Sequence, residues 1–210
     1  IFFTKKYEES NILFLQKLLK ENNIEYFFDI GAHMGFYSIN MASIFPDLLI
    51  SSFEPIEGNY NQLKLNVEIN DFVSKIKIYK KVLSNESKEI KMWVPKKERT
   101  GGFSVYNEND IELKKYESGK ISFEYSSSEK LDNICKIKNK KIALKIDVER
   151  HEKFVILGAN EILTKNDVLL QIEIFDQMKV EVAMILKKLN FNFIKSNGND
   201  YFYSNFKILN

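Results

Sequence analysis

Four acidic side chains stand at the ends of apolar segments in this chain of 210 residues. They are Asp29, Glu54, Asp147 and Glu173. Open α/β sheets bind their ligands beside the carboxyl ends of the strands, so acids placed there are candidates for binding or catalysis. A carboxylate accepts hydrogen bonds from hydroxyl groups, attracts an ammonium group and takes a proton from a substrate.

The segment after Asp29 has two glycines four residues apart, Gly31 and Gly35, before an apolar helical pattern. It predicts a strand, a tight loop and a helix whose free N–H groups face a ligand. The spacing differs from the G-x-G-x-x-G of a dinucleotide site. An acid before such a turn suits a ligand with an amino group beside a sugar, as in S-adenosylmethionine. An ordinary strand-to-helix turn is the alternative.

Glu54 ends the next apolar segment, 25 residues after Asp29. Nucleotide-binding βαβ units place a ribose-binding acid at an interval of about 20 residues, so we expect Glu54 to bind a cis-diol. A solvated acid in a turn is the simpler alternative. Farther along, Leu83 and Ser84 leave a third strand at a point where an adenine could stack.

A second segment rich in ionisable side chains runs from Lys145 through Asp147 and Glu149 to His151. It follows an apolar strand pattern and is the predicted source of a general base. Asp147 has the best position, and the imidazole of His151 titrates nearest neutrality. Two alternatives stay open. His151 could be an exposed residue without a role, and Asp147 could share a divalent cation such as Mg²⁺, or a hydrogen bond, with Glu173.

The composition is that of a globular protein, with 44% hydrophobic and 29% charged residues and a net charge of +2. Basic and acidic residues are interspersed, so we expect no nucleic-acid partner. The single cysteine, Cys135, excludes an intrachain disulfide and favours the cytoplasm. No apolar run approaches the roughly 20 residues of a transmembrane helix. We expect one domain over residues 1–210, with the oligomeric state left open.

Apolar segments of strand and helix type alternate along the chain, which predicts an α/β fold with a parallel sheet. The expected strands are 24–29, 48–53, 76–79, 141–146, 168–174, 191–195 and 201–206, the last two as a hairpin. The expected helices are 10–22, 36–45, 59–70 and 179–189. The pattern breaks at about 85–125, where we expect an inserted hairpin or lid. Ser126 and Glu129 then suggest a capping box for a short helix through Cys135.

The chain between Phe27 and Phe175 resembles the FkbM family of S-adenosylmethionine-dependent methyltransferases. The resemblance is carried by Asp29–Ser38, Phe53–Pro55 with Asn59, Leu63 and Asn66, Leu131–Asp132, Leu144–Glu149 and Gly158–Ala159. It implies a class I methyltransferase fold, which is Rossmann-like. Seven strands in the order 3-2-1-4-5-7-6 would form a mostly parallel sheet, with the last strand antiparallel and helices on both faces. It also implies O-methylation of a hydroxyl on a carbohydrate, glycolipid or natural-product acceptor.

The same resemblance implies which residues hold S-adenosylmethionine. Asp29, Gly31 and Gly35 would hold the methionine part, Glu54 the ribose, and the region of Leu83 the adenine. The full expected set is Asp29, Gly31, Ala32, His33, Met34, Gly35, Ser38, Glu54, Pro55, Asn59, Leu83 and Ser84.

Arg150 departs from the family, which usually has glycine after Asp-Val-Glu. Glycine permits a positive φ, which arginine does not adopt freely. Either the backbone there is ordinary or Arg150 reaches toward an anionic acceptor. The departure leaves open a cofactor-binding module without activity. A nicotinamide-dependent oxidoreductase on a similar sheet is a separate alternative, against which the missing G-x-G-x-x-G counts.

Overall fold

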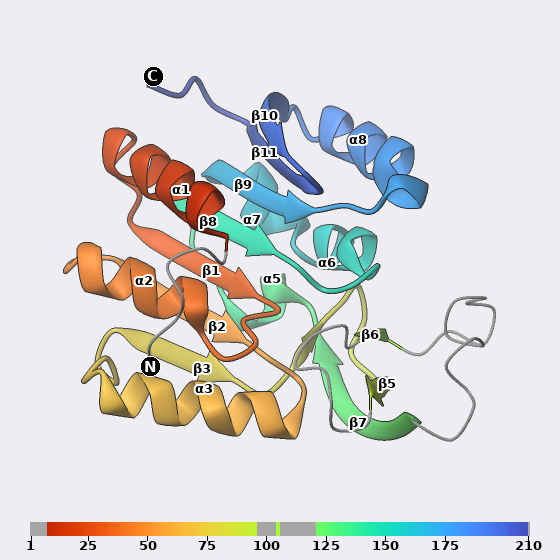
Figure 1. Cartoon of the computed structure of the whole chain (residues 1–210). Coiled ribbons are helices and arrows are strands. Elements are labelled where there is room, and N and C mark those ends of the chain that lie inside the picture. The colour runs from red at the N-terminus through yellow and green to blue at the C-terminus, as the bar shows by residue number, and fades with distance from the viewer. Residues whose placement is uncertain (1–7, 96–103, 106–120, 210) are drawn as a thin grey trace.

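The computed structural model describes residues 8–95, 104–105 and 121–209. Its largest sheet has seven strands in the order β10-β11-β9-β8-β1-β2-β3 (Figure 1). The strands are β1 (Tyr26–Ile30), β2 (Leu49–Phe53), β3 (Ile76–Tyr79), β8 (Lys141–Ile146), β9 (Asp167–Glu173), β10 (Asn192–Asn197) and β11 (Asp200–Ser204). Strand β11 is antiparallel to both neighbours, whereas β9, β8, β1, β2 and β3 pair in parallel. The order and the directions of the seven strands are those that the resemblance to the FkbM family implies.

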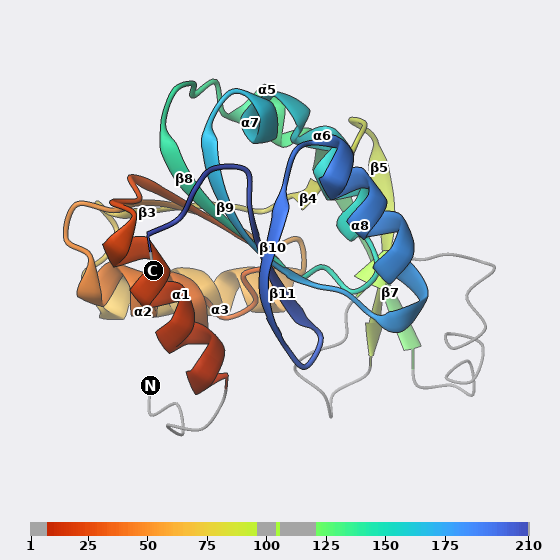
Figure 2. The same cartoon turned by 90° about the horizontal axis from the view of Figure 1, so that it is seen from above.

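Helices cover both faces of this sheet (Figure 2). One face carries α1 (Glu9–Glu21), α2 (Phe36–Ile44) and α3 (Glu57–Ile69). The other carries α5 (Leu131–Ile134), α6 (Glu152–Gly158), α7 (Asn160–Thr164) and α8 (Lys179–Lys188), the last preceded by the 3-10 helix η1 (Asp176–Met178). Among the described helices, none is both long and apolar enough to cross a membrane.

Each face of the sheet has its own hydrophobic core, because side chains alternate between the faces along a strand. In β1, Phe27 packs with the core under α1 to α3, and Phe28 packs with the core under α5 to α8. In β8, Leu144 and Ile146 belong to the second core and Ala143 to the first. A polar residue in β8 must therefore be accommodated within a buried face.

The segment after β3 forms a second, four-stranded sheet in the order β4-β7-β5-β6. Its strands are β4 (Val82–Leu83), β5 (Glu89–Pro95), β6 (Ser104–Val105) and β7 (Ile121–Glu129). Strands β5 and β7 are antiparallel, and Ile90 and Met92 of β5 pack against Ile56 and Val82. Figure 1 shows this sheet beyond the carboxyl ends of β1 and β2. Its role as a lid stays a prediction.

The predicted capping box at Ser126 and Glu129 is wrong, because both residues belong to strand β7. Ser126 pairs in register with Ile90 of β5. Helix α5 begins two residues after Glu129, and Lys130 at its N-cap makes no side-chain capping bond. A local serine-to-glutamate spacing could not reveal that β5 pairs with Ser126 and β4 with Glu129, both from more than 30 residues earlier in the chain.

Candidate functional site

The predicted acidic residues meet at the carboxyl edge of the main sheet. Asp29 pairs in register with Lys145 on the neighbouring strand. Glu54 directly follows β2, Asp147 directly follows β8, and Glu173 ends β9. Adjacent parallel strands therefore bring together carboxyl groups that are far apart in the sequence.

The two glycines of the loop after β1 both adopt positive φ, 80° at Gly31 and 86° at Gly35. A Cβ on Gly31 would lie 1.8 Å from the carbonyl oxygen of Asp147. A Cβ on Gly35 would lie 2.4 Å from Cδ1 of Leu63 in α3. The sequence pattern predicted that a ligand approaches these glycines. The atoms that lie against the two positions instead belong to the protein. The glycines allow the loop to lie directly on α3 and on the loop that carries Asp147.

The Asp29 carboxylate is buried and anchors the start of α2. Its Oδ2 accepts hydrogen bonds from the backbone N–H of Ser38, at 3.1 Å, and from the Ser38 hydroxyl, at 2.6 Å. Its Oδ1 is buried and has no partner among the described residues. Burial raises the pKa of Asp29, against the opposing effects of Lys145 and Ser38.

Glu54 is 4% exposed and ties the glycine loop to the start of α3. Its carboxylate accepts the backbone N–H groups of His33 at 2.9 Å and Ile56 at 3.0 Å, and the Asn59 side-chain amide at 3.4 Å. Burial raises the pKa of Glu54 to about 7, although these hydrogen bonds oppose the shift. A carboxylate has about four acceptor positions, so one more donor, such as a ribose hydroxyl, can be accepted.

Four more residues of the expected cofactor set lie in the loops that follow β1 and β2. Ala32 is buried, and the Met34 carbonyl accepts the Asn66 side-chain amide at 2.8 Å. His33 is half-buried with a φ of 50°, and burial lowers its pKa. Pro55 is half-buried next to Glu54.

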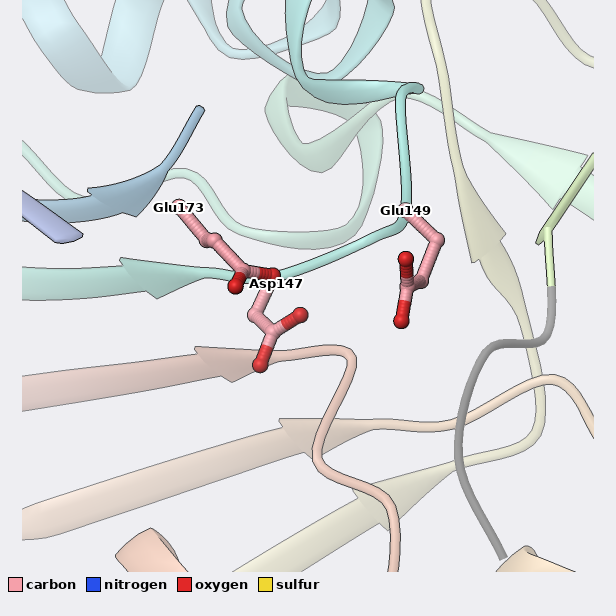
Figure 3. A group of neighbouring side chains, drawn as sticks. All are labelled: Asp147, Glu149 and Glu173. Atoms are coloured by element: carbon pink, nitrogen blue, oxygen red, sulfur yellow. The ribbon is translucent and has the colours of Figure 1, made fainter. Parts of the chain in front are cut away.

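Three carboxyl groups form a cluster where β8 and β9 end. The side chains of Asp147, Glu149 and Glu173 each offer an oxygen within 4.8 Å of the others (Figure 3). Burial raises the pKa of Glu173 to about 9, and the Asp147 carboxylate adds to the shift. Burial also acts to raise the pKa of Asp147, but the Lys145 ammonium and hydrogen bonds with Lys145 and Glu173 outweigh it, so this pKa is lowered. At neutral pH, Glu173 therefore keeps a proton that it shares with ionised Asp147.

Lys145 supplies the compensating positive charge from within β8. The residue is 5% exposed, and its Nζ lies 2.9 Å from Oδ2 of Asp147. The ammonium also lies 4.6 Å from the centroid of the Tyr37 ring in α2. Burial acts to lower the pKa of Lys145, but the charges of Asp147 and Asp29 prevail and raise it. Lys145 is therefore a permanent cation in this site.

The backbone at Arg150 is not ordinary. Its φ is 76°, and the preceding residue, Glu149, also has a positive φ of 50°. The first of the two possibilities raised by the missing glycine is therefore wrong. A non-glycine residue in this conformation costs about 1 to 2 kcal/mol. The Arg150 guanidinium lies 5.7 Å from the centroid of the Phe175 ring, on the segment that follows β9.

His151 is buried, so the alternative that it is an exposed histidine is wrong. It is 8% exposed, its ring stacks on Phe154 at 4.7 Å, and its Nε2 lies 3.0 Å from the Ser84 hydroxyl. Burial lowers the pKa of His151 to about 4. Its imidazole is therefore neutral and weakly basic at pH 7, unlike a free histidine. Leu83 and Ser84 are buried as well, with Leu83 inside a hydrophobic core.

Sequence reasoning assigned no role to Glu152 and did not foresee the contact made by Gly158. Glu152 at the start of α6 is fully buried, and its Oε1 accepts the backbone N–H of Arg150 at 2.9 Å. Gly158 lets α6 lie against the segment after β4, because a Cβ there would stand 1.9 Å from the Ser84 carbonyl oxygen. The family spacing marked Gly158, but the close approach depends on an element more than 70 residues away in sequence.

The strand order, the glycine loop and the acids at the sheet edge together define a class I methyltransferase fold. Comparison with known families then places the chain more narrowly. The FkbM methyltransferase domain matches residues 29–199, and the chain belongs to this family.

Solved structures share the fold at low sequence identity. The precorrin-6y C5,15-methyltransferase of Geobacter metallireducens aligns with a TM-score of 0.53 and 11% identity, over 95% of this chain and 87% of that one. A candidate rRNA methylase of Clostridium thermocellum aligns with a TM-score of 0.56 and 9% identity, over 93% of this chain and 92% of that one. The precorrin 8w decarboxylase of Methanobacterium thermoautotrophicum aligns with a TM-score of 0.52 and 8% identity, over 93% of this chain and 89% of that one. No curated protein matched the sequence. These likenesses support the fold, whereas the names differ in substrate and reaction.

Proposed function

We propose that the chain transfers a methyl group from S-adenosylmethionine to a hydroxyl of a carbohydrate, glycolipid or natural-product acceptor. Membership of the FkbM methyltransferase family supports the methyl transfer and the cofactor. The observation that carries the proposal is the carboxyl cluster of Asp147, Glu149 and Glu173, beside the glycine loop. An acceptor hydroxyl needs a base as its oxygen becomes bonded to the methyl carbon, and this cluster offers one.

The donor set at the sheet edge fits S-adenosylmethionine chemically. The cofactor has a cationic amino group, a sulfonium and a ribose diol, all of which suit carboxylates. Asp29 has one buried oxygen without a partner among the described residues, and Glu54 has acceptor capacity left. We assign the methionine part to the side of Asp29 and the ribose to Glu54. When bound, the cofactor supplies a methyl group already activated by its sulfonium leaving group.

Asp147 is the proposed base, with Lys145 and Glu173 as its partners. The carboxylate is ionised at neutral pH because Lys145 lies 2.9 Å away, and the proton of Glu173 orients it. A weak base is sufficient, since the acidity of the acceptor hydroxyl rises steeply as its oxygen bonds to carbon. His151 is less suited, because it is buried against Ser84 and Phe154. The Arg150 guanidinium is proposed to orient an anionic part of the acceptor.

A direct test is incubation of the full chain with radiolabelled S-adenosylmethionine and extracts containing polysaccharides, glycolipids or sugar nucleotides. Label that is released by glycosidases and resists ribonuclease and protease supports the proposal. Asp147→Asn should lower turnover by roughly 10² to 10⁴ while leaving cofactor binding nearly intact. Exclusive labelling of RNA or protein would overturn the acceptor class. Turnover that depends on added Mg²⁺ after chelation would instead point to a metal at the carboxyl cluster.

A further inference from the structure

The loop between β8 and α6, residues 147–151, has a backbone that needs support. Glu149 and Arg150 are consecutive non-glycine residues with φ values of 50° and 76°. Such conformations persist only where the surrounding structure holds them. The support matters because this same loop begins with Asp147 and carries Glu149 to the carboxyl cluster.

The first residue of the loop is attached to the sheet. The backbone N–H of Asp147 donates to the Ile30 carbonyl of β1 at 3.0 Å. The Asp147 carbonyl oxygen lies so close to Gly31 that no Cβ could be placed there. These contacts hold the start of the loop, but they do not reach the two residues with positive φ.

The other end of the loop is held by Glu152. This carboxyl group is fully buried, and its Oε1 accepts the backbone N–H of Arg150 at 2.9 Å. Burial raises the pKa of Glu152 to about 7, and hydrogen bonds with the backbone of Glu152 itself, Arg150 and Val148 act against the shift. Its Oε2 has no hydrogen-bond partner in the described part of the chain. A buried carboxyl group with one unsatisfied oxygen is costly, and the hydrogen bond of its other oxygen goes to the loop after β8.

We propose that Glu152 is the positioning residue that holds the loop after β8, and through it Asp147 and Glu149, in the arrangement at the sheet edge. The proposal rests on the proposed function, in which Asp147 receives the acceptor proton. Glu152 does not touch the substrate in this scheme. It keeps the Arg150 amide, and with it the positive-φ turn, in place.

The test compares Glu152→Ala with Glu152→Gln in the full chain. The alanine variant should exchange the backbone amide hydrogens of residues 148–152 at least about tenfold faster, as measured by hydrogen-exchange mass spectrometry, because the Arg150 amide loses its acceptor. Its kcat should fall about 100-fold, since a displacement of about 1 Å at a catalytic group has this effect, while KM for S-adenosylmethionine changes little. The glutamine variant keeps an acceptor oxygen. It should retain most of the protection of the loop from exchange and most of the wild-type kcat.

Two further variants separate positioning from a general loss of stability. Asp132→Ala removes a carboxylate that accepts the amides of Glu161 and Ile162 at the start of α7, at 2.9 and 3.0 Å. It should lower the melting temperature without changing exchange in the loop after β8. The double variant Arg150→Gly with Glu152→Ala should regain part of the protection of residues 148, 149, 151 and 152, because glycine adopts positive φ without help, whereas the amide of residue 150 still lacks its acceptor.

Wild-type exchange and wild-type kcat in Glu152→Ala would overturn the proposal, as would a double variant that exchanges as fast as Glu152→Ala alone. If the wild-type protein methylates no acceptor, the proposed function fails. The exchange measurements still decide the positioning role in that case, because they require no turnover.

Discussion

At the scale of single residues, burial decides what each ionisable group can do. The four strand-end acids are chemically alike, but Glu54 is enclosed by backbone donors whereas Asp147 faces a lysine ammonium. Burial raises the pKa of Glu54, and the Lys145 charge overcomes burial at Asp147. Two strand-end carboxyl groups thus differ in charge, one half-ionised near neutrality and the other ionised at neutral pH.

Cofactor affinity should depend on the ionisation of Glu54. Its pKa is about 7, so the carboxylate that accepts ribose hydroxyls is present above this pH and is lost as pH falls through it. S-adenosylhomocysteine should bind about tenfold more weakly at pH 6 than at pH 8, measured by titration calorimetry. The Glu54→Gln variant should bind S-adenosylhomocysteine weakly at both pH values, so its affinity should not depend on pH. A wild-type affinity that is flat across this range contradicts the assignment of Glu54 to the ribose.

Stability should also depend on pH through Glu173. Its pKa is about 9 in the folded protein against an ordinary value of 4.5, so folding favours the protonated form. This contribution to stability is complete below pH 4.5 and is lost as pH rises through 9. Relative to Glu173→Gln, the wild type should lose about 1 to 2 kcal/mol between pH 5 and pH 9, after allowance for solvent screening.

Urea denaturation at the two pH values measures this difference. Asp176→Asn, which replaces a carboxylate that is 89% exposed by a neutral amide, controls for the loss of one negative charge. Parallel pH dependences of wild type and Glu173→Gln would show that Asp147 and Glu173 do not share a proton.

At the scale of elements, the site is a set of loops held against one another. The glycine loop lies on the loop after β8 at Gly31 and on α3 at Gly35, and α6 lies on the segment after β4 at Gly158. At each of these glycines, a backbone or side-chain atom of another element lies where a Cβ would have to be. The elements that carry the cofactor set and the carboxyl cluster are therefore coupled through these glycines.

Replacing Arg150 by glycine should stabilise the protein. Relief of the positive φ is worth about 1 to 2 kcal/mol, and the greater freedom of glycine in the unfolded chain takes back about 0.4 to 1 kcal/mol. We expect a net gain of about 0.5 to 1 kcal/mol in urea denaturation. Asn190→Gly is the matched control, because asparagine at its φ of 62° is already well accommodated. Destabilisation by Arg150→Gly alone would mean that the contact with Phe175 outweighs the strain.

At the scale of the whole molecule, the acids that lie in or directly after β1, β2, β8 and β9 converge at the carboxyl edge of the main sheet. The helices on both faces and the two hydrophobic cores hold these four strand ends in register. A ligand bound at this edge contacts several elements at once, so it should stabilise the folded state as a unit.

Thermal unfolding should therefore distinguish the two cofactor classes. S-adenosylhomocysteine at about 100 times its dissociation constant should add about 2.7 kcal/mol to the free energy of unfolding and raise the melting temperature by several degrees. NAD at the same concentration should leave it unchanged, because the glycine spacing lacks the dinucleotide pattern. Stabilisation by NAD alone would support the oxidoreductase alternative, and a response to neither compound would contradict both enzyme functions.

The sequence by itself determined where the seven strands of the main sheet and helices α1, α2, α3 and α8 lie along the chain, because their apolar patterns are local. It did not predict α6 and α7. It also marked Asp29, Glu54 and Asp147, since an acid after an apolar strand is visible without any contact. The boundaries of β10 and β11 differ from the expected hairpin by only one or two residues. The family motifs supplied the strand order, which periodicity does not contain.

Only the tertiary structure decided the charge states and the contacts of the site. The pairing of Glu173 with Asp147, the burial of His151 against Ser84 and the support of Arg150 by Glu152 each join separate elements or depend on a loop conformation. The failed capping box has the same cause, because pairing with β5 prevailed over a local motif. A pKa depends on burial and neighbouring charges, and a strand-end carboxylate acquires both only when the strands assemble into one sheet.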